Sequence, residues 1–146
     1  MASIPLAVGL RASVRVVVGE SDTAAALGSG DVPVLGTPRL LALAEAATVA
    51  AVAPQLPSGE TTVGTSVTME HRRASPVGSS LVIEAELTEV DGPRLVFSFI
   101  ARAHSSAPAE PPGADEDVVG AGTIERVVVT RERFLARAAA HQPGAR

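Results

Sequence analysis

The 146-residue sequence has no cysteine, no tryptophan, no tyrosine and only three phenylalanines. Without cysteine the chain has no disulfide framework, no thiolate nucleophile and no cysteine-ligated zinc or iron–sulfur site. No other side chains show a metal-ligand spacing, so we expect neither a metal nor a cofactor. The net charge is −4 and no basic stretch is interleaved with aromatic residues, so nucleic acid is not an expected partner.

Long hydrophobic runs are also missing. The longest apolar stretch, residues 40–53, contains Glu45 and stops at Pro54, well short of a bilayer span. The short apolar segment 4–10 lacks the charged start and the cleavage site of a signal peptide. We therefore expect a cytoplasmic protein with no membrane contact.

The length of the chain fits one domain over residues 1–146, with a core from about 12 to 134, a flexible acidic loop at 105–117 and a short C-terminal tail.

What is present is a core built from small side chains, because 46% of the residues are hydrophobic although aromatics are scarce. From Gly36 the sequence GTPRLLALAEAATVAAVAP predicts a helix, with Thr37 as N-cap, Pro38 at the first helical position and a stop at Pro54. This helix is apolar on nearly every side, which predicts that it is enclosed.

Alternating apolar residues predict strands before and after this helix. A hairpin between residues 79–90 and 94–104 is predicted by Asp91-Gly92-Pro93. In each of these two strands, alternate apolar residues share one face: Leu81, Ile83, Ala85 and Leu87 in the first, and Leu95, Phe97, Phe99 and Ala101 in the second. Residues 20–34 read as a loop or a short turn of helix. The predicted strands are 12–18, 61–72, 79–90, 94–104 and 118–129, and a final helix covers 131–140.

The resulting β-α-β-β-β-β order predicts an α+β hotdog fold, in which an antiparallel sheet wraps around one central buried helix. A helix on an open sheet leaves its far side uncovered, so we expect a homodimer. The sequence leaves open whether two dimers pair into a tetramer.

Glu45 and His71 are polar residues at positions that the pattern makes apolar. Glu45 lies mid-helix, where a carboxylate needs a partner, and it either belongs to a site or points into a solvent gap at a dimer edge. His71 ends a strand on the same predicted face as Val63, Val67 and Met69. It is either a hydrogen-bonded core residue or an acid/base group near neutral pH.

Thr37 has a complete structural explanation as an N-cap, but a helix N-terminus can also stabilise an oxyanion beside the hydroxyl. Other candidates are weaker. We assign His104 to a solvated strand end and His141 to the tail. Three arginines, Arg72, Arg73 and Arg126, could each meet the phosphates of a nucleotide or be merely solvated.

Taken together, the run from Gly36 to Phe99 and the later VGAGTIERVVVTRERF resemble the fluoroacetyl-coenzyme A thioesterase family and its hotdog relatives. The most specific parts are the helix around A-E-A-A, the strand V-G-T-S-V-T-M-E-H-R-R-A-S-P-V-G and the late G-T-I-E-R. The resemblance implies Thr37, Glu45 and His71 as the catalytic residues and Gly36, Gly64 and Arg126 as substrate-binding residues. It also implies a metal-free dimer that binds the coenzyme A part of its substrate across the subunit interface.

The sequence departs from this family at two places. The segment between the first strand and the helix lacks the aromatic residues of the fluoroacetyl enzyme's lid, and Ile124 stands where the late motif has histidine. The resulting hypothesis is hydrolysis of a small acyl-coenzyme A thioester, in which Glu45 orients His71 and His71 activates water or the Thr37 hydroxyl. A hotdog acyl-thioester hydratase or dehydratase, and a non-catalytic module that binds acyl-coenzyme A or another hydrophobic small molecule, are the alternatives.

Overall fold

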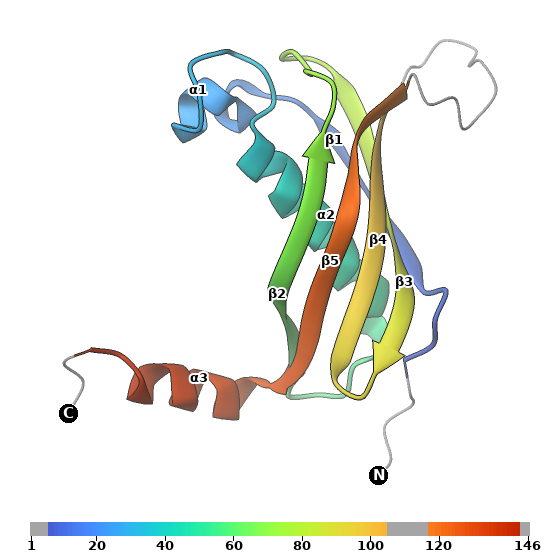
Figure 1. Cartoon of the computed structure of the whole chain (residues 1–146), viewed down its shortest axis with the longest axis vertical. Helices are drawn as coiled ribbons and strands as arrows, with labels where there is room; N and C mark the ends of the chain where they lie inside the picture. Colours follow the sequence, from blue (N-terminus) through green and yellow to red (C-terminus); the bar gives the residue numbers. More distant parts are fainter. Residues whose placement is uncertain (1–5, 105–116, 144–146) are drawn as a thin grey trace.

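A five-stranded antiparallel sheet forms one side of the molecule, and one long helix crosses its inner surface (Figure 1). The computed structural model describes residues 6–104 and 117–143. The strand order is β1-β3-β4-β5-β2, which places β1 and β2 at the two edges. The elements are β1 (Arg11–Val17), η1 (Glu20–Asp22), α1 (Ala24–Leu27), α2 (Thr37–Val52), η2 (Ala53–Gln55), β2 (Glu60–His71), β3 (Ser80–Asp91), β4 (Arg94–Ala103), β5 (Val118–Thr130) and α3 (Arg131–Ala140).

The predicted element order and the predicted faces of β3 and β4 are confirmed. The β3–β4 hairpin closes through Gly92 and Pro93, and Gly92 has a φ of 58°, which favours glycine. All eight predicted inward residues of these strands are buried: Leu81, Ile83, Ala85, Leu87, Leu95, Phe97, Phe99 and Ala101.

The start of α2 differs from the prediction by one residue. The N-cap is Gly36, because its carbonyl oxygen accepts the first helical hydrogen bonds, from the N–H groups of Arg39 and Leu40. Thr37 is instead the first helical residue. Its hydroxyl is therefore not used for capping, and the structural explanation that we gave for this residue is wrong.

Within one chain, helix α2 is buried on the side that faces the sheet and uncovered on its far side, as expected for a helix on an open sheet. The side that faces the sheet is buried, whereas Ala42, Ala46 and Ala50 are exposed and Val49 is 40% exposed. Composition cannot separate these two sides because alanine occurs on both. The buried residues of α2 are Leu40, Leu43, Ala44, Ala47, Thr48, Ala51 and Val52.

Strand β2 contains a β-bulge that simple alternation does not predict. Gly64 pairs with Arg126 and Ser66 with Glu125, so Thr65 is an extra residue without a pairing partner. Even-numbered residues of β2 before the bulge and odd-numbered residues after it therefore face α2. Val67, Met69 and His71 share that face as predicted, but Val63 lies on the outer face.

Segments outside the sheet shape the region around the start of α2. The predicted loop 20–34 contains η1 and the one-turn helix α1, and a Cβ atom at Gly36 would lie 2.9 Å from the Leu27 side chain. The predicted acidic loop falls almost wholly on residues 105–116, outside the described residues. None of the described helices combines the length and the apolarity needed to cross a membrane.

Candidate active site

The start of α2 and the end of β2 bring Thr37 and His71 together. Thr37 Oγ1 lies 2.8 Å from His71 Nδ1, a hydrogen-bond distance between two residues that are 34 positions apart in sequence. This contact depends on the helix beginning at Thr37 and on the bulge that turns His71 inward. A hydroxyl next to an imidazole is the arrangement in which a nucleophile and a general base occur in enzymes.

The environment of His71 favours the neutral imidazole. Burial lowers the pKa of His71 below its ordinary value, and the backbone of Arg73 raises it by a smaller amount. The other ring nitrogen, Nε2, is buried and has no hydrogen-bond partner among the described residues. A buried polar atom in this state is costly, so a bound ligand or water would be stabilised there.

A pocket of about 290 Å³ opens beside this pair. Its walls come from the end of β2 and the segment that follows it, and from the segment between α1 and α2. No aromatic side chain lines it, in agreement with the sequence of that segment. The lining residues are Ala24, Ser29, Gly30, Val32, Val34, Leu35, Thr37, His71, Arg72, Arg73 and Ala74.

Glu45 belongs to a second polar cluster, further along α2. Its carboxylate accepts a hydrogen bond of 2.8 Å from Arg126 Nη1. Arg126 is only 6% exposed, and its other two nitrogens donate to Thr62, with Nε 2.9 Å from the hydroxyl and Nη2 3.0 Å from the carbonyl oxygen. A buried guanidinium held at three points by hydrogen bonds is fixed in orientation.

Gly64 leaves the space in which this ion pair lies. A Cβ atom at position 64 would be 2.6 Å from Glu45 Oε2 and 3.4 Å from Arg126 Nη1. Because Arg126 holds the Glu45 carboxylate in place, even an alanine would push the pair apart. The close approach of the β2 backbone to the carboxylate therefore explains a glycine here.

The structure thus groups the predicted residues into two pairs, Thr37 with His71 and Glu45 with Arg126. Along α2, Thr37 and Glu45 are separated by eight residues, or about 12 Å of helix axis. Within one chain the Glu45 carboxylate bonds Arg126 and not His71, so its predicted effect on His71 stays a prediction.

Thr62, which anchors Arg126, was not among the residues predicted from the sequence. Its only signal is the position two residues before Gly64 on the same strand face.

The weaker candidates lie outside both pairs. His104 lies 3.4 Å from Arg15, His141 follows the end of α3, and both histidines are exposed. Ile124, at the position of the family's histidine, is fully buried in the core. Among the described residues, no three acidic or histidine side chains are grouped so that they could hold a metal ion.

Comparison with known proteins gives consistent results. A family model described as fluoroacetyl-CoA-specific thioesterase matches residues 18–132. The fluoroacetyl-CoA thioesterase of Streptantibioticus cattleyicolor is 38% identical over 104 residues, which cover 71% of this chain and 67% of that protein. A solved structure of a fluoroacetyl-CoA thioesterase mutant in complex with acetyl-CoA has a TM-score of 0.80 and 30% identity, over 94% of this chain and 100% of that one.

A hot-dog-like protein from Thermanaerovibrio acidaminovorans has a TM-score of 0.78 over 94% of this chain and 93% of its own, at 22% identity, which shows the fold alone. The sheet, the helix and these likenesses define a hotdog-fold protein of the thioesterase superfamily. The matches in sequence go further, and the chain belongs to the fluoroacetyl-CoA-specific thioesterase family. It is an acyl-CoA thioesterase, a hydrolase of thioester bonds.

Proposed function

We propose that this chain hydrolyses a small acyl-coenzyme A thioester at the Thr37–His71 pair. The observation that carries this assignment is the 2.8 Å contact between Thr37 Oγ1 and His71 Nδ1, at the edge of a pocket and at the start of a helix. An imidazole held neutral by burial is ready to accept a proton near neutral pH.

In the proposed reaction, His71 takes a proton from water or from the Thr37 hydroxyl as the oxygen attacks the thioester carbonyl carbon. The negative charge on the carbonyl oxygen is stabilised by the Thr37 N–H group at the start of α2, because Pro38 has no N–H group and those of Arg39 and Leu40 already donate to Gly36. When the carbon–sulfur bond breaks, the proton on His71 passes to the departing thiolate. If Thr37 is the nucleophile, water then releases the acyl group by the same steps.

We assign Glu45 and Arg126, where Gly64 lets the β2 backbone come close, to the acyl-binding end of a site that a second copy of the chain completes. Within one chain they lie about 12 Å along α2 from Thr37, a distance that a small acyl group cannot span. Thr62 orients the guanidinium, and Glu45 is the more exposed member of the ion pair, so a polar acyl group would meet a pair of fixed orientation. Because Glu45 is bonded to Arg126 in a single chain, an influence of its carboxylate on His71 would act through bound substrate or water, or across a subunit boundary.

Coenzyme A enters this proposal only as part of the substrate. Arg72 and Arg73 line the pocket next to His71, and guanidinium groups pair well with phosphate. Arg72 already forms an exposed ion pair of 2.9 Å with Glu70, which a phosphate would compete with. We therefore place the nucleotide end of the substrate on this side of the pocket.

We propose a homodimer in which a second copy covers the exposed side of α2 and the edge of the sheet at β2. Val49 and Val67 are 40% and 37% exposed there, and an edge strand carries unpaired backbone groups. Thr37 and part of Glu45 lie on the same exposed surface, so the site would be completed at the subunit boundary. Sedimentation equilibrium should give a mass of two chains, and a monomer at micromolar concentration would contradict this.

The test of the proposed activity is thiol release from a panel of acyl-coenzyme A esters that includes acetyl- and fluoroacetyl-coenzyme A. We expect release of free thiol with the short acyl groups, and no enoyl or hydroxyacyl interconversion. Saturable binding without any thiol release would instead identify a binding module, and hydration without thiol release would identify a hydratase. Because the pocket lacks aromatic residues, the panel must decide which acyl group is preferred.

A further inference from the structure

Strand β2 contributes residues to the site from both of its halves, and an uninterrupted strand could not place these residues on the same face of the sheet. Gly64 faces Glu45, and His71 faces Thr37, so both lie on the side of the sheet that carries α2. These two strand residues are seven positions apart. In a regular strand, residues an odd number of positions apart point to opposite faces.

The bulge at Thr65 resolves this conflict. Before it, Gly64 pairs with the inward Arg126, and after it Val67 pairs with the fully buried Ile124. If β2 alternated regularly through Thr65 instead of forming a bulge there, the positions facing α2 would be Ser66, Thr68 and Glu70, and His71 would lie on the outer face. The orientation of His71 therefore depends on the bulge that takes up Thr65.

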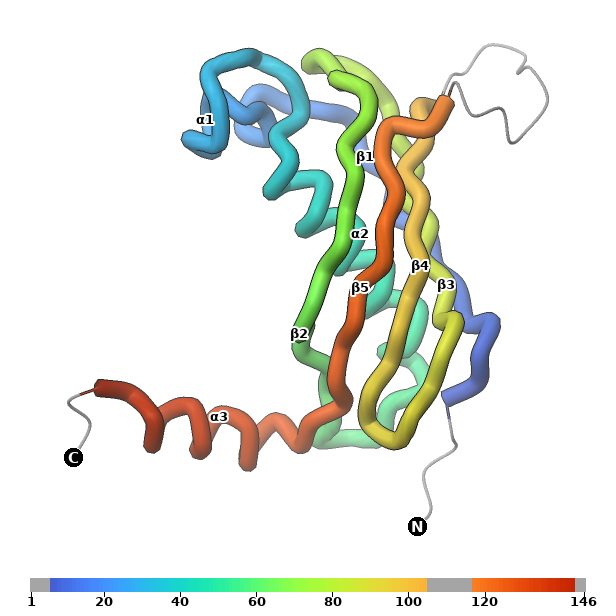
Figure 2. Tube along the Cα trace, viewed as in Figure 1, coloured from blue at the N-terminus to red at the C-terminus, as the bar shows by residue number. Residues whose placement is uncertain are grey.

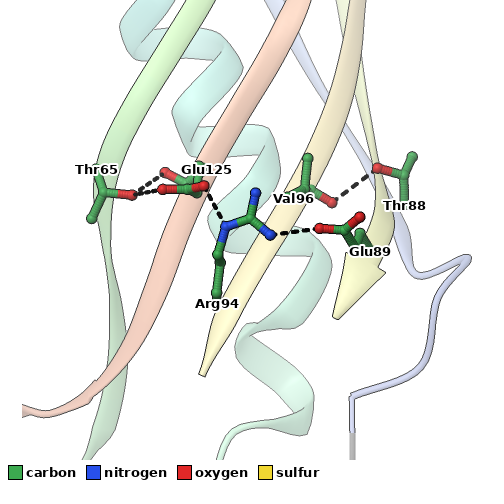
Figure 3. Close-up of polar contacts among 6 residues, drawn as sticks. All are labelled: Thr65, Thr88, Glu89, Arg94, Val96 and Glu125. Atoms are coloured by element: carbon green, nitrogen blue, oxygen red, sulfur yellow. Dashed lines mark hydrogen bonds and ion pairs between the residues drawn. The ribbon is translucent and has the colours of Figure 1, made fainter. Parts of the chain in front are cut away.

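A polar network on the outer face of the sheet holds Thr65 at the bulge (Figure 3). The Thr65 hydroxyl lies 2.9 Å from the Glu125 carboxylate and 3.2 Å from the Glu125 carbonyl oxygen, which share its proton. Arg94 donates to the same carboxylate and also to Glu89. The Thr65 hydroxyl, and after it Arg94, lower the pKa of Glu125, as expected for a carboxylate held by donors.

The sheet contains a second bulge of similar construction, and Figure 3 shows the Thr88–Val96 contact at this bulge beside the network. Thr88 is the extra residue between Leu87 and Glu89 in β3, and its hydroxyl donates to the carbonyl oxygen of Val96 at 3.1 Å. No predicted site residue follows it on that strand, which ends at the hairpin. Thr88 therefore provides a matched control: the same residue type in the same kind of bulge, remote from the site.

We propose that Thr65, together with Glu125, is a positioning residue for the hydrolytic reaction: by holding the bulge in β2 from the outer face, it turns His71 toward Thr37. This proposal rests on the proposed function of His71 as the acid/base group. Neither Thr65 nor Glu125 touches the Thr37–His71 pair; they act through the backbone of β2.

The test compares Thr65→Val, Thr65→Ser and Thr88→Val with the wild type. Valine keeps the shape and strand preference of threonine but removes the hydroxyl. We expect Thr65→Val to lower kcat by about ten- to a hundredfold, as misplacement of a reacting group does, with a KM within about twofold. Thr65→Ser should restore most of kcat, and Thr88→Val should leave it unchanged although it loses a similar hydrogen bond.

A spectroscopic measurement separates positioning from activity. The pKa of the His71 ring, followed by NMR and assigned with His71→Gln, should rise toward its ordinary value in Thr65→Val, because the ring becomes more exposed to solvent. It should not change in Thr88→Val. A Thr65→Val protein with wild-type kcat and wild-type His71 pKa would overturn the proposal.

The proposal and the proposed function can fail separately. If the wild type released no thiol from any ester, the function would fail, but the NMR comparison would still decide whether Thr65 sets the orientation of His71. If Thr65→Val does not fold, Glu125→Ala is judged by the same two criteria with a smaller expected change. That variant removes the carboxylate acceptor of Thr65 while keeping the carbonyl acceptor.

Discussion

Two polar pairs lie along α2, and they differ in charge, burial and support. The Thr37–His71 pair is neutral, lies at the start of the helix with Thr37 exposed and His71 partly buried, and is joined by a contact of 2.8 Å. The Glu45–Arg126 pair is charged, and its guanidinium is buried and fixed by two further hydrogen bonds to Thr62. A pair that must exchange a proton with substrate needs access and a group that titrates near neutral pH. A pair that only presents a charge gains from being rigid.

The largest expected effect comes from removing the titrating member of the first pair. His71→Ala should lower kcat by roughly a hundred- to ten-thousandfold, the range typical of a lost acid/base group. The measurement is thiol release at saturating substrate, with far-UV circular dichroism to show that the fold is intact. His104→Ala removes an exposed histidine outside the site and serves as the control. Unchanged hydrolysis in His71→Ala would remove its proposed role and the contrast between the pairs.

The second pair should affect stability more than the first. Glu45→Leu leaves the charge of the buried Arg126 without its partner and should cost about 3 kcal/mol of unfolding free energy. Arg126→Leu leaves a carboxylate that can still reach water, since Glu45 is 35% exposed, and should cost less, about 2 kcal/mol. Thr37→Ala, in contrast, should change stability by no more than about 0.5 kcal/mol while it lowers kcat.

Urea unfolding of the single variants and of the Glu45→Leu/Arg126→Leu double variant measures this difference. The double variant should be more stable than the sum of the single effects predicts, because it leaves no unpaired charge. If the three single variants lost similar stability, the distinction between a rigid charged pair and an accessible neutral pair would be wrong.

The same two pairs show what the sequence could and could not predict. Thr37, Glu45 and His71 could be selected because a polar side chain at an apolar position or at a helix start is visible in the local pattern. The faces of β3 and β4 were predictable for a related reason, since large apolar residues alternate there without interruption.

The partners of these residues could not be predicted. Arg126 and Thr62 are 64 positions apart, so their contact depends on the register between β2 and β5. That register contains the bulge at Thr65, which lies in a run of small and polar residues where no apolar pattern marks a shift in parity. Which side of α2 is exposed could not be predicted for a similar reason, because alanine fits a buried and an exposed surface equally well.

The smallest expected effect is on the pH dependence of the first pair. Burial lowers the pKa of His71, with only a partial opposing contribution from the Arg73 backbone, so the ring stays neutral into mildly acidic solution. The acidic limb of the pH profile of kcat/KM should therefore have its midpoint below about pH 6.5, where 6.5 is the ordinary pKa of histidine.

The lowered pKa of His71 also makes the stability of the fold depend on pH. The unfolded chain binds this proton more readily than the folded protein, so the contribution of His71 to stability is complete above about pH 6.5 and is lost as the pH falls through the lowered pKa. His71→Ala should lack this contribution, whereas His104→Ala should keep it. An acidic limb centred at or above 6.5 would show that the imidazole is not held neutral by burial and would make the first pair as dependent on charge as the second.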